Sequence, residues 1–184
     1  MQVFRETGAY LKGHFKLTSG RHSDEYLQCA LVLQHPKIAE RFGAELASKL
    51  GPCEVVASPA IGGLIIGHEV ARAMGARFVF GERDASGRMT LRRGFSVKPG
   101  ETAIVIEDVV TTGGSTREVI DLLKAEGAAV KGAGSIVDRS AGRADVGVPR
   151  VSLATLDVVS YPPEDCLLCK QGIPVTKPGS RPTA

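Results

Sequence analysis

The stretch Ala103-Ile104-Val105-Ile106-Glu107-Asp108-Val109-Val110-Thr111-Thr112-Gly113-Gly114-Ser115-Thr116 decides the fold. Its apolar beginning shows no alternation, which predicts a strand covered on both faces, as in a parallel sheet. Ser115 followed by Glu118 is a capping-box pattern and predicts that a helix starts at Ser115. Gly127 is well placed to end that helix. A strand, a tight loop and a helix N-terminus together predict an anion site, because backbone N–H groups and the helix dipole point at the loop.

Other loops of this general kind do not fit. A P-loop needs Lys after its last glycine, and the chain contains no Gly-Lys pair and no G-x-G-x-x-G pattern. Glycosidase chemistry needs carboxyls roughly 5 to 10 Å apart across a bond, whereas Glu107 and Asp108 are neighbours in one loop. The remaining alternative is an ordinary strand-to-helix turn with surface acids.

Length and composition predict one globular domain that occurs in the cytosol. The chain has 184 residues, 43% of them hydrophobic and 23% charged, and a formal charge of +3. That mild charge weakly favours an anionic small ligand and argues against a nucleic-acid partner. We expect no signal peptide, no membrane span and reduced thiols, because the N-terminus is polar, apolar runs are short and the cysteines are scattered.

A second strand–loop–helix unit accompanies the first. Residues 36–50 predict a helix that Pro36 begins and Gly51 ends. Residues 54–58 predict a strand that runs into Pro59-Ala60-Ile61-Gly62-Gly63 and a helix to about residue 74, which is another anion site. Further strands are expected at 77–80, 130–137 and 151–159. The fold class is therefore α/β, with a mostly parallel sheet flanked by helices.

Four segments each allow two interpretations. The polar turn 17–23, between two extended pieces, is part of a ligand-binding hood with Tyr26 or a plain surface hairpin. The basic segment 81–99 is a mobile lid, which we favour, or a solvated hairpin over 89–97. Arg139 at a strand end pairs with a substrate carboxylate or forms a surface ion pair. Cys166-Leu-Leu-Cys169 is half of a zinc ribbon or, as we favour, two plain thiols.

The chain resembles the orotate phosphoribosyltransferase family, a group of type I phosphoribosyltransferases. The resemblance rests on residues 15–21, 59–63, 107–115 and 137–139, which follow in the family's order over nearly the whole chain. It implies transfer of phosphoribosyl from phosphoribosyl pyrophosphate (PRPP) to orotate in pyrimidine biosynthesis. It also implies one domain over 1–184, with a hood formed by about 1–35 and the C-terminal segment.

The resemblance extends to the ligands and to the assembly. It implies Mg²⁺ held mainly by PRPP with no protein ligand, a homodimer whose lid covers the partner's site, and no nucleic-acid or membrane partner. The 5′-phosphate would lie on the loop N–H groups and hydroxyls, and the two acids would bind the ribose hydroxyls and stabilise positive charge on the ring.

Carried over by position, three sets of residues are implied. The catalytic residues are Glu107, Asp108 and the lid arginine Arg92, and the orotate-binding residues are Thr111, Arg139 and Tyr26. The PRPP-binding residues are Ala60, Gly62, Arg83, Glu107, Asp108, Val109, Val110, Thr111, Thr112, Gly113, Gly114 and Ser115.

The sequence departs from the better-known family pattern in three places. Thr18 stands where many members have Lys, Ile61-Gly62 replace an aromatic-Lys pair, and the arginines of 88–93 replace a lid bearing Lys and His. The alternatives are a purine phosphoribosyltransferase and a PRPP- or nucleotide-sensing regulator that binds RNA.

Overall fold

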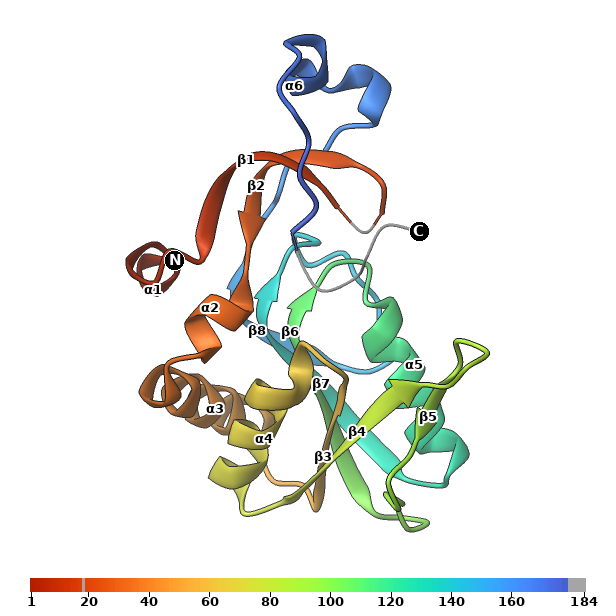
Figure 1. The fold of residues 1–184 in the computed structure, drawn as a ribbon. Coiled ribbons are helices and arrows are strands. Elements are labelled where there is room, and N and C mark those ends of the chain that lie inside the picture. Colours follow the sequence, from red (N-terminus) through yellow and green to blue (C-terminus); the bar gives the residue numbers. More distant parts are fainter. Residues whose placement is uncertain (18, 179–184) are drawn as a thin grey trace. The chain divides into compact units, whose positions relative to one another are not determined.

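The computed structural model describes residues 1–17 and 19–178. The chain divides into two compact units (Figure 1). The smaller unit consists of Met1–Val32 and the segment from Asp157 onward, and the larger consists of Leu33–Leu156.

The larger unit is built on a six-stranded sheet with the order β5-β4-β3-β6-β7-β8. All neighbours pair in parallel except β4 and β5, which form an antiparallel hairpin. The strands are β3 (Val55–Pro59), β4 (Arg77–Arg83), β5 (Met89–Leu91), β6 (Thr102–Val110), β7 (Ala129–Asp138) and β8 (Arg150–Thr155). The predicted fold class, a mostly parallel sheet with flanking helices, is confirmed.

Helices cover both faces of this sheet. On one face, α5 (Gly114–Ala125) packs Val119, Ile120 and Leu123 against alternate residues of β3 and β6. On the other face lie α3 (Pro36–Leu50), whose Leu46 approaches Gly134 of β7, and α4 (Gly63–Met74). Because β3 and β6 are buried on both sides, their apolar runs do not alternate.

The connections of the strands diverge between β3 and β6. From β3 the chain passes through α4 to β4 on one side, and from β6 it passes through α5 to β7 on the other side. The two connections diverge between neighbouring parallel strands, which makes a topological switch point. Ligands of open α/β sheets bind at such points, beyond the carboxyl ends of the strands.

The smaller unit contains a β-hairpin and the C-terminal segment. Strand β1 pairs with β2 in antiparallel fashion, with a bulge between Lys12 and Phe15. Thr176 pairs with the first strand and Tyr161 with the second, which ties the C-terminal segment to the hairpin. The elements are α1 (Gln2–Glu6), β1 (Tyr10–Lys16), β2 (His22–Leu27), α2 (Cys29–Leu33), a 3-10 helix (Pro163–Asp165) and α6 (Leu167–Lys170).

Two expectations about elements are wrong. The strand expected over 151–159 ends at Thr155, because its partner β7 ends at Asp138, opposite Thr155. The helix expected to start at Ser115 starts at Gly114, and no side chain caps it. Among the described residues, no helix combines the length and the apolar character that a membrane crossing needs.

Candidate active site at the switch point

The loop after β6 is compact because of a glycine. Gly113 has φ of 81°, and a Cβ there would lie 2.7 Å from Val146 Cγ1, so only glycine fits. The tight turn leads directly into α5, whose first-turn N–H groups have no partner within the helix. Thr111, Thr112 and Gly114 are exposed. The loop therefore presents N–H groups and hydroxyls to a ligand, as an anion site requires.

Glu118 has a different role from the predicted cap. Its carboxylate pairs with Arg83 Nη2 at 2.7 Å, and the guanidinium also donates to the Gly87 carbonyl at 2.7 Å. Arg83, a predicted PRPP ligand, thus lies at the end of β4 beside α5. The ion pair holds the β4–β5 hairpin next to the helix that follows the loop.

The two acids lie within β6, which ends at Val110, and not in a loop as expected, and they interact with each other. Glu107 is buried, with 8% of its surface exposed, and Asp108 is half-buried. The Asp108 backbone N–H donates to Glu107 Oε1 at 3.3 Å. Burial, and then the neighbouring Asp108 carboxylate, raise the pKa of Glu107 well above its usual value, and burial also raises the pKa of Asp108. Donors or a cation from a ligand would relieve this cost, which is the behaviour expected of a site for sugar hydroxyls.

The loop after β3 touches this acid pair. Gly62 has helical backbone angles, and a Cβ there would lie 2.6 Å from Asp108 Oδ1. A Cβ on Gly63 would lie 2.9 Å from the Ile106 carbonyl. The absence of side chains thus lets the second predicted anion loop, 59–63, approach the acid-bearing part of β6 directly. Both predicted loops follow neighbouring parallel strands at the switch point.

The basic segment after β4 forms a hairpin in part. Strands β4 and β5 pair from Gly81 opposite Leu91 to Arg83 opposite Met89, around a turn in which Asp84 accepts from Ser86 and Arg88. This hairpin lies earlier in the chain than the one expected over 89–97. Arg92, the predicted catalytic arginine, follows it and is exposed. Whether this segment closes over a ligand stays a prediction.

Arg139 lies beside the acid-bearing strand. Its backbone N–H donates to the Val110 carbonyl at 2.8 Å, and the residue is half-buried. The carboxylate of the preceding Asp138 binds Arg150 Nη1 at 2.8 Å and accepts from Ser140 Oγ at 2.6 Å. Arg139 and Thr111 therefore both follow neighbouring strand ends, as their predicted roles require.

The remaining predicted residues divide between the units. Ala60 lies in the loop after β3, within the larger unit. Tyr26 lies in the smaller unit, half-buried, with its ring 5.7 Å from that of Phe15. Thr18 lies outside the described residues.

An α/β domain with this switch-point site is the architecture of the phosphoribosyltransferases. The model of the phosphoribosyl transferase domain family matches residues 37–160. A structure of adenine phosphoribosyltransferase from Thermoanaerobacter pseudethanolicus shares the fold at a TM-score of 0.62, with 18% identity, over 72% of this chain and 88% of that one.

More similar relatives show which phosphoribosyltransferase family the chain belongs to. A protein named orotate phosphoribosyltransferase from Pelotomaculum thermopropionicum is 58% identical over 97% of this chain and 95% of its own length. One of the same name from Thermotoga petrophila is 54% identical over 98% and 97%. The orotate phosphoribosyltransferase structure from Aeropyrum pernix has a TM-score of 0.72, with 28% identity, over 93% of this chain and 97% of that one. The chain belongs to the orotate phosphoribosyltransferase family.

Proposed function

We propose that this chain transfers the phosphoribosyl group from PRPP to orotate, giving orotidine 5′-monophosphate and pyrophosphate in pyrimidine biosynthesis. The observation that carries the proposal is the close approach of the loop after β3 to the acid pair of β6, at Gly62 and Asp108, just before the other anion loop. PRPP is anionic at both ends of its ribose, and two adjoining loops of this kind suit such a ligand.

The residues of the larger unit would act by positioning and by charge. The backbone of Thr111 to Ser115 would hold the 5′-phosphate, and the loop that contains Ala60 and Gly62 would lie against the pyrophosphate. Glu107 and Asp108 would accept hydrogen bonds from the ribose hydroxyls. Asp108, as a carboxylate, would stabilise the positive charge that builds on the ring as the bond at C1′ breaks.

The acceptor, orotate, would bind at the end of the neighbouring strand, β7. Arg139 would form a fork-like pair with the orotate carboxylate, and Thr111 and Tyr26 would contact the same substrate. Orotate N1 then attacks C1′ directly. No protein nucleophile is required, so the rate enhancement comes from orientation and electrostatic stabilisation.

The site also suits Mg²⁺ bound through its substrate. The two carboxyl groups near the end of β6 are oxygen acceptors that would hold Mg²⁺-bound waters, while the direct ligands would be mainly PRPP oxygens. When bound, Mg²⁺ neutralises the leaving pyrophosphate.

We further infer a homodimer in the cytoplasm. The exposed arginines after β5, Arg92 among them, suit a lid that covers the pyrophosphate of a partner's site. None of the four cysteines forms a disulfide, as is usual in a reducing compartment.

A substrate panel tests the proposal. We expect PRPP consumption with orotate and none with adenine, hypoxanthine or uracil. No product with orotate would refute the assignment, and product with adenine or hypoxanthine would favour a purine enzyme.

Arg139→Ala tests the acceptor site. We expect the orotate KM to rise about 10- to 100-fold, because a hydrogen bond to a charged group is worth about 1.5–3 kcal/mol, and we expect little change in the PRPP KM. Equal rises in both constants would contradict the carboxylate role. Arg41→Ala, on the exposed face of α3, is the control.

A further inference from the structure

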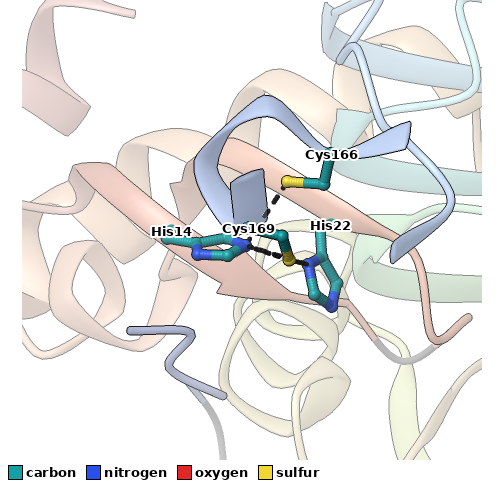
Figure 2. A group of neighbouring side chains, drawn as sticks. All are labelled: His14, His22, Cys166 and Cys169. Atoms are coloured by element: carbon teal, nitrogen blue, oxygen red, sulfur yellow. Dashed lines mark hydrogen bonds between the residues drawn. The ribbon is translucent and has the colours of Figure 1, made fainter. Parts of the chain in front are cut away.

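Four metal-ligating side chains meet in the smaller unit, apart from every residue assigned to catalysis in the larger one. They are His14 on β1, His22 on β2, and Cys166 and Cys169 at the start of α6 (Figure 2). Their ligand atoms all lie within 4.8 Å of one another. His14, His22 and Cys166 are buried, at 3%, 5% and 1% exposure, whereas Cys169 is exposed, so the group lies at the edge of the unit's interior.

Four of the six separations between the ligand atoms are close to the edges of a tetrahedral zinc site. His14 Nε2 lies 2.9 Å from His22 Nδ1, 3.4 Å from Cys166 Sγ and 3.7 Å from Cys169 Sγ. Cys169 Sγ lies 3.3 Å from His22 Nδ1. Usual zinc–ligand bond lengths give tetrahedron edges of about 3.4 Å between nitrogens, 3.6 Å between nitrogen and sulfur and 3.8 Å between sulfurs. Each of these four separations is within about 0.5 Å of the corresponding edge.

The hydrogen bonding of His14 prepares it as a ligand. Its Nδ1 lies 2.7 Å from the Ile173 carbonyl oxygen, which can only accept, so Nδ1 carries the proton. Nε2 then presents its lone pair to the cluster. A backbone carbonyl on the second ring nitrogen is the usual support of a metal-bound histidine.

Hydrogen bonds alone do not account for the cluster. The single lone pair of His14 Nε2 accepts one strong hydrogen bond, yet His22 Nδ1 and both cysteine sulfurs converge on it. A cation at the centre satisfies all four atoms at once. The backbone has a suitable form, since Cys166 precedes α6 and its carbonyl accepts from the Lys170 N–H, so that both sulfurs are held on one turn.

We propose that these four side chains bind one Zn²⁺ ion, which staples the C-terminal segment to the β1–β2 hairpin. Two thiolates and two imidazoles in a tetrahedron suit zinc, and a site whose four positions are filled by protein is structural. Binding releases the two thiol protons to solvent, while each histidine coordinates through its unprotonated nitrogen. The staple suits a unit with a small apolar core, for which a metal supplies folding energy.

Metal content of the full chain tests the proposal directly. We expect one zinc per chain by elemental analysis after growth in zinc-supplemented medium and gel filtration, and no loss when excess Mg²⁺ is added. The Co²⁺-substituted protein should show intense d–d bands of a tetrahedral site and a thiolate-to-cobalt charge-transfer band. Substoichiometric zinc, another metal at full occupancy, a Cys166–Cys169 disulfide in the freshly purified protein, or Co²⁺ spectra without thiolate bands would each overturn it.

Matched variants locate the ligands. Cys169→Ser and His22→Ala should reduce zinc to near zero, whereas Cys53→Ser and His68→Ala, outside the cluster, should leave one zinc per chain. Full zinc in either ligand variant would refute the assignment. If the ligand variants do not fold, chemical modification of the thiols in the wild-type protein tests the assignment instead. Zinc should be released as two thiols per chain are modified. Zinc release without thiol modification would exclude cysteine ligands.

Discussion

The substitution Gly62→Ala should lower kcat/KM for PRPP without unfolding the protein. Gly62 has φ of −57° and ψ of −41°, angles that alanine adopts without strain. The new Cβ would lie 2.6 Å from Asp108 Oδ1, 2.9 Å from Cγ and 3.0 Å from Oδ2. Because ordinary contact begins at 3.4 Å, the carboxylate of Asp108 must retreat by about 0.8 Å.

The expected loss follows from that displacement. A retreat of about 0.8 Å breaks a hydrogen bond from a ribose hydroxyl, and a hydrogen bond to a charged group is worth about 1.5–3 kcal/mol. The kcat/KM for PRPP should therefore fall about 10- to 100-fold, in line with the cost of misplacing a catalytic group by about 1 Å. Stability should change little, because a compatible Gly→Ala substitution stabilises by about 0.4–1 kcal/mol and offsets part of the crowding.

A double-mutant cycle tests whether Asp108 transmits the effect. The assay is kcat/KM for PRPP at saturating orotate, with the melting temperature measured in parallel. In an Asp108→Ala background the added methyl group contacts no carboxylate. Gly62→Ala should therefore lower kcat/KM for PRPP by less than about twofold in that background. Full activity of the single variant would refute the reasoning about the acid. An equal loss in both backgrounds would show that the methyl group acts on something other than Asp108.

Two predictions concern stability. Glu107→Gln should raise the melting temperature more at pH 8 than at pH 5, while lowering activity. The folded pKa of Glu107 lies above its unfolded value, so wild type loses stability as pH rises from the unfolded pKa through the folded one, and glutamine removes that loss. The control Glu45→Gln, on an exposed face, should show no such pH dependence, and a parallel profile for both variants would contradict the assignment. Arg150→Ala should cost about 3–5 kcal/mol in urea unfolding, because it removes the arginine partner of the buried Asp138 carboxylate, which is 1% exposed. Arg88→Ala breaks an exposed ion pair and should cost less than about 1 kcal/mol, and equal costs would show that burial of the pair has no effect.

The parts of the fold that could be predicted are those that local patterns specify. The two strand–loop–helix units need only an apolar run, a glycine-containing loop and a helical stripe, and all of these lie within about 25 consecutive residues. The sequence did not predict that β3 lies beside β6, which the structure shows. The structure also shows how closely the loop after β3 approaches β6, which depends on the missing Cβ atoms of Gly62 and Gly63.

Long-range contacts explain the local predictions that failed. Ser115 and Glu118 have capping-box spacing, but Arg83 arrives from β4 and pairs with Glu118. The glycine turn at Gly113 fits tightly against Val146, and the helix starts one residue before Ser115. The sequence around 115 contains neither of these partners, so the competing pairings could not be weighed from it.

The proposed zinc site also depends on contacts between segments far apart in the sequence. The pair Cys166-x-x-Cys169 was interpreted as plain thiols because no second cysteine pair follows it. The missing half comes from histidines about 150 residues earlier, which the hairpin register brings together. Lys16 pairs with His22, so His14, two residues before Lys16, lies on the same face of the hairpin as His22. His22 was expected in the polar turn 17–23 but lies on β2, so its place opposite the first strand did not follow from the sequence. The bulge after Lys12 and the return of the chain at Thr176, which complete the geometry, follow from tertiary pairing alone.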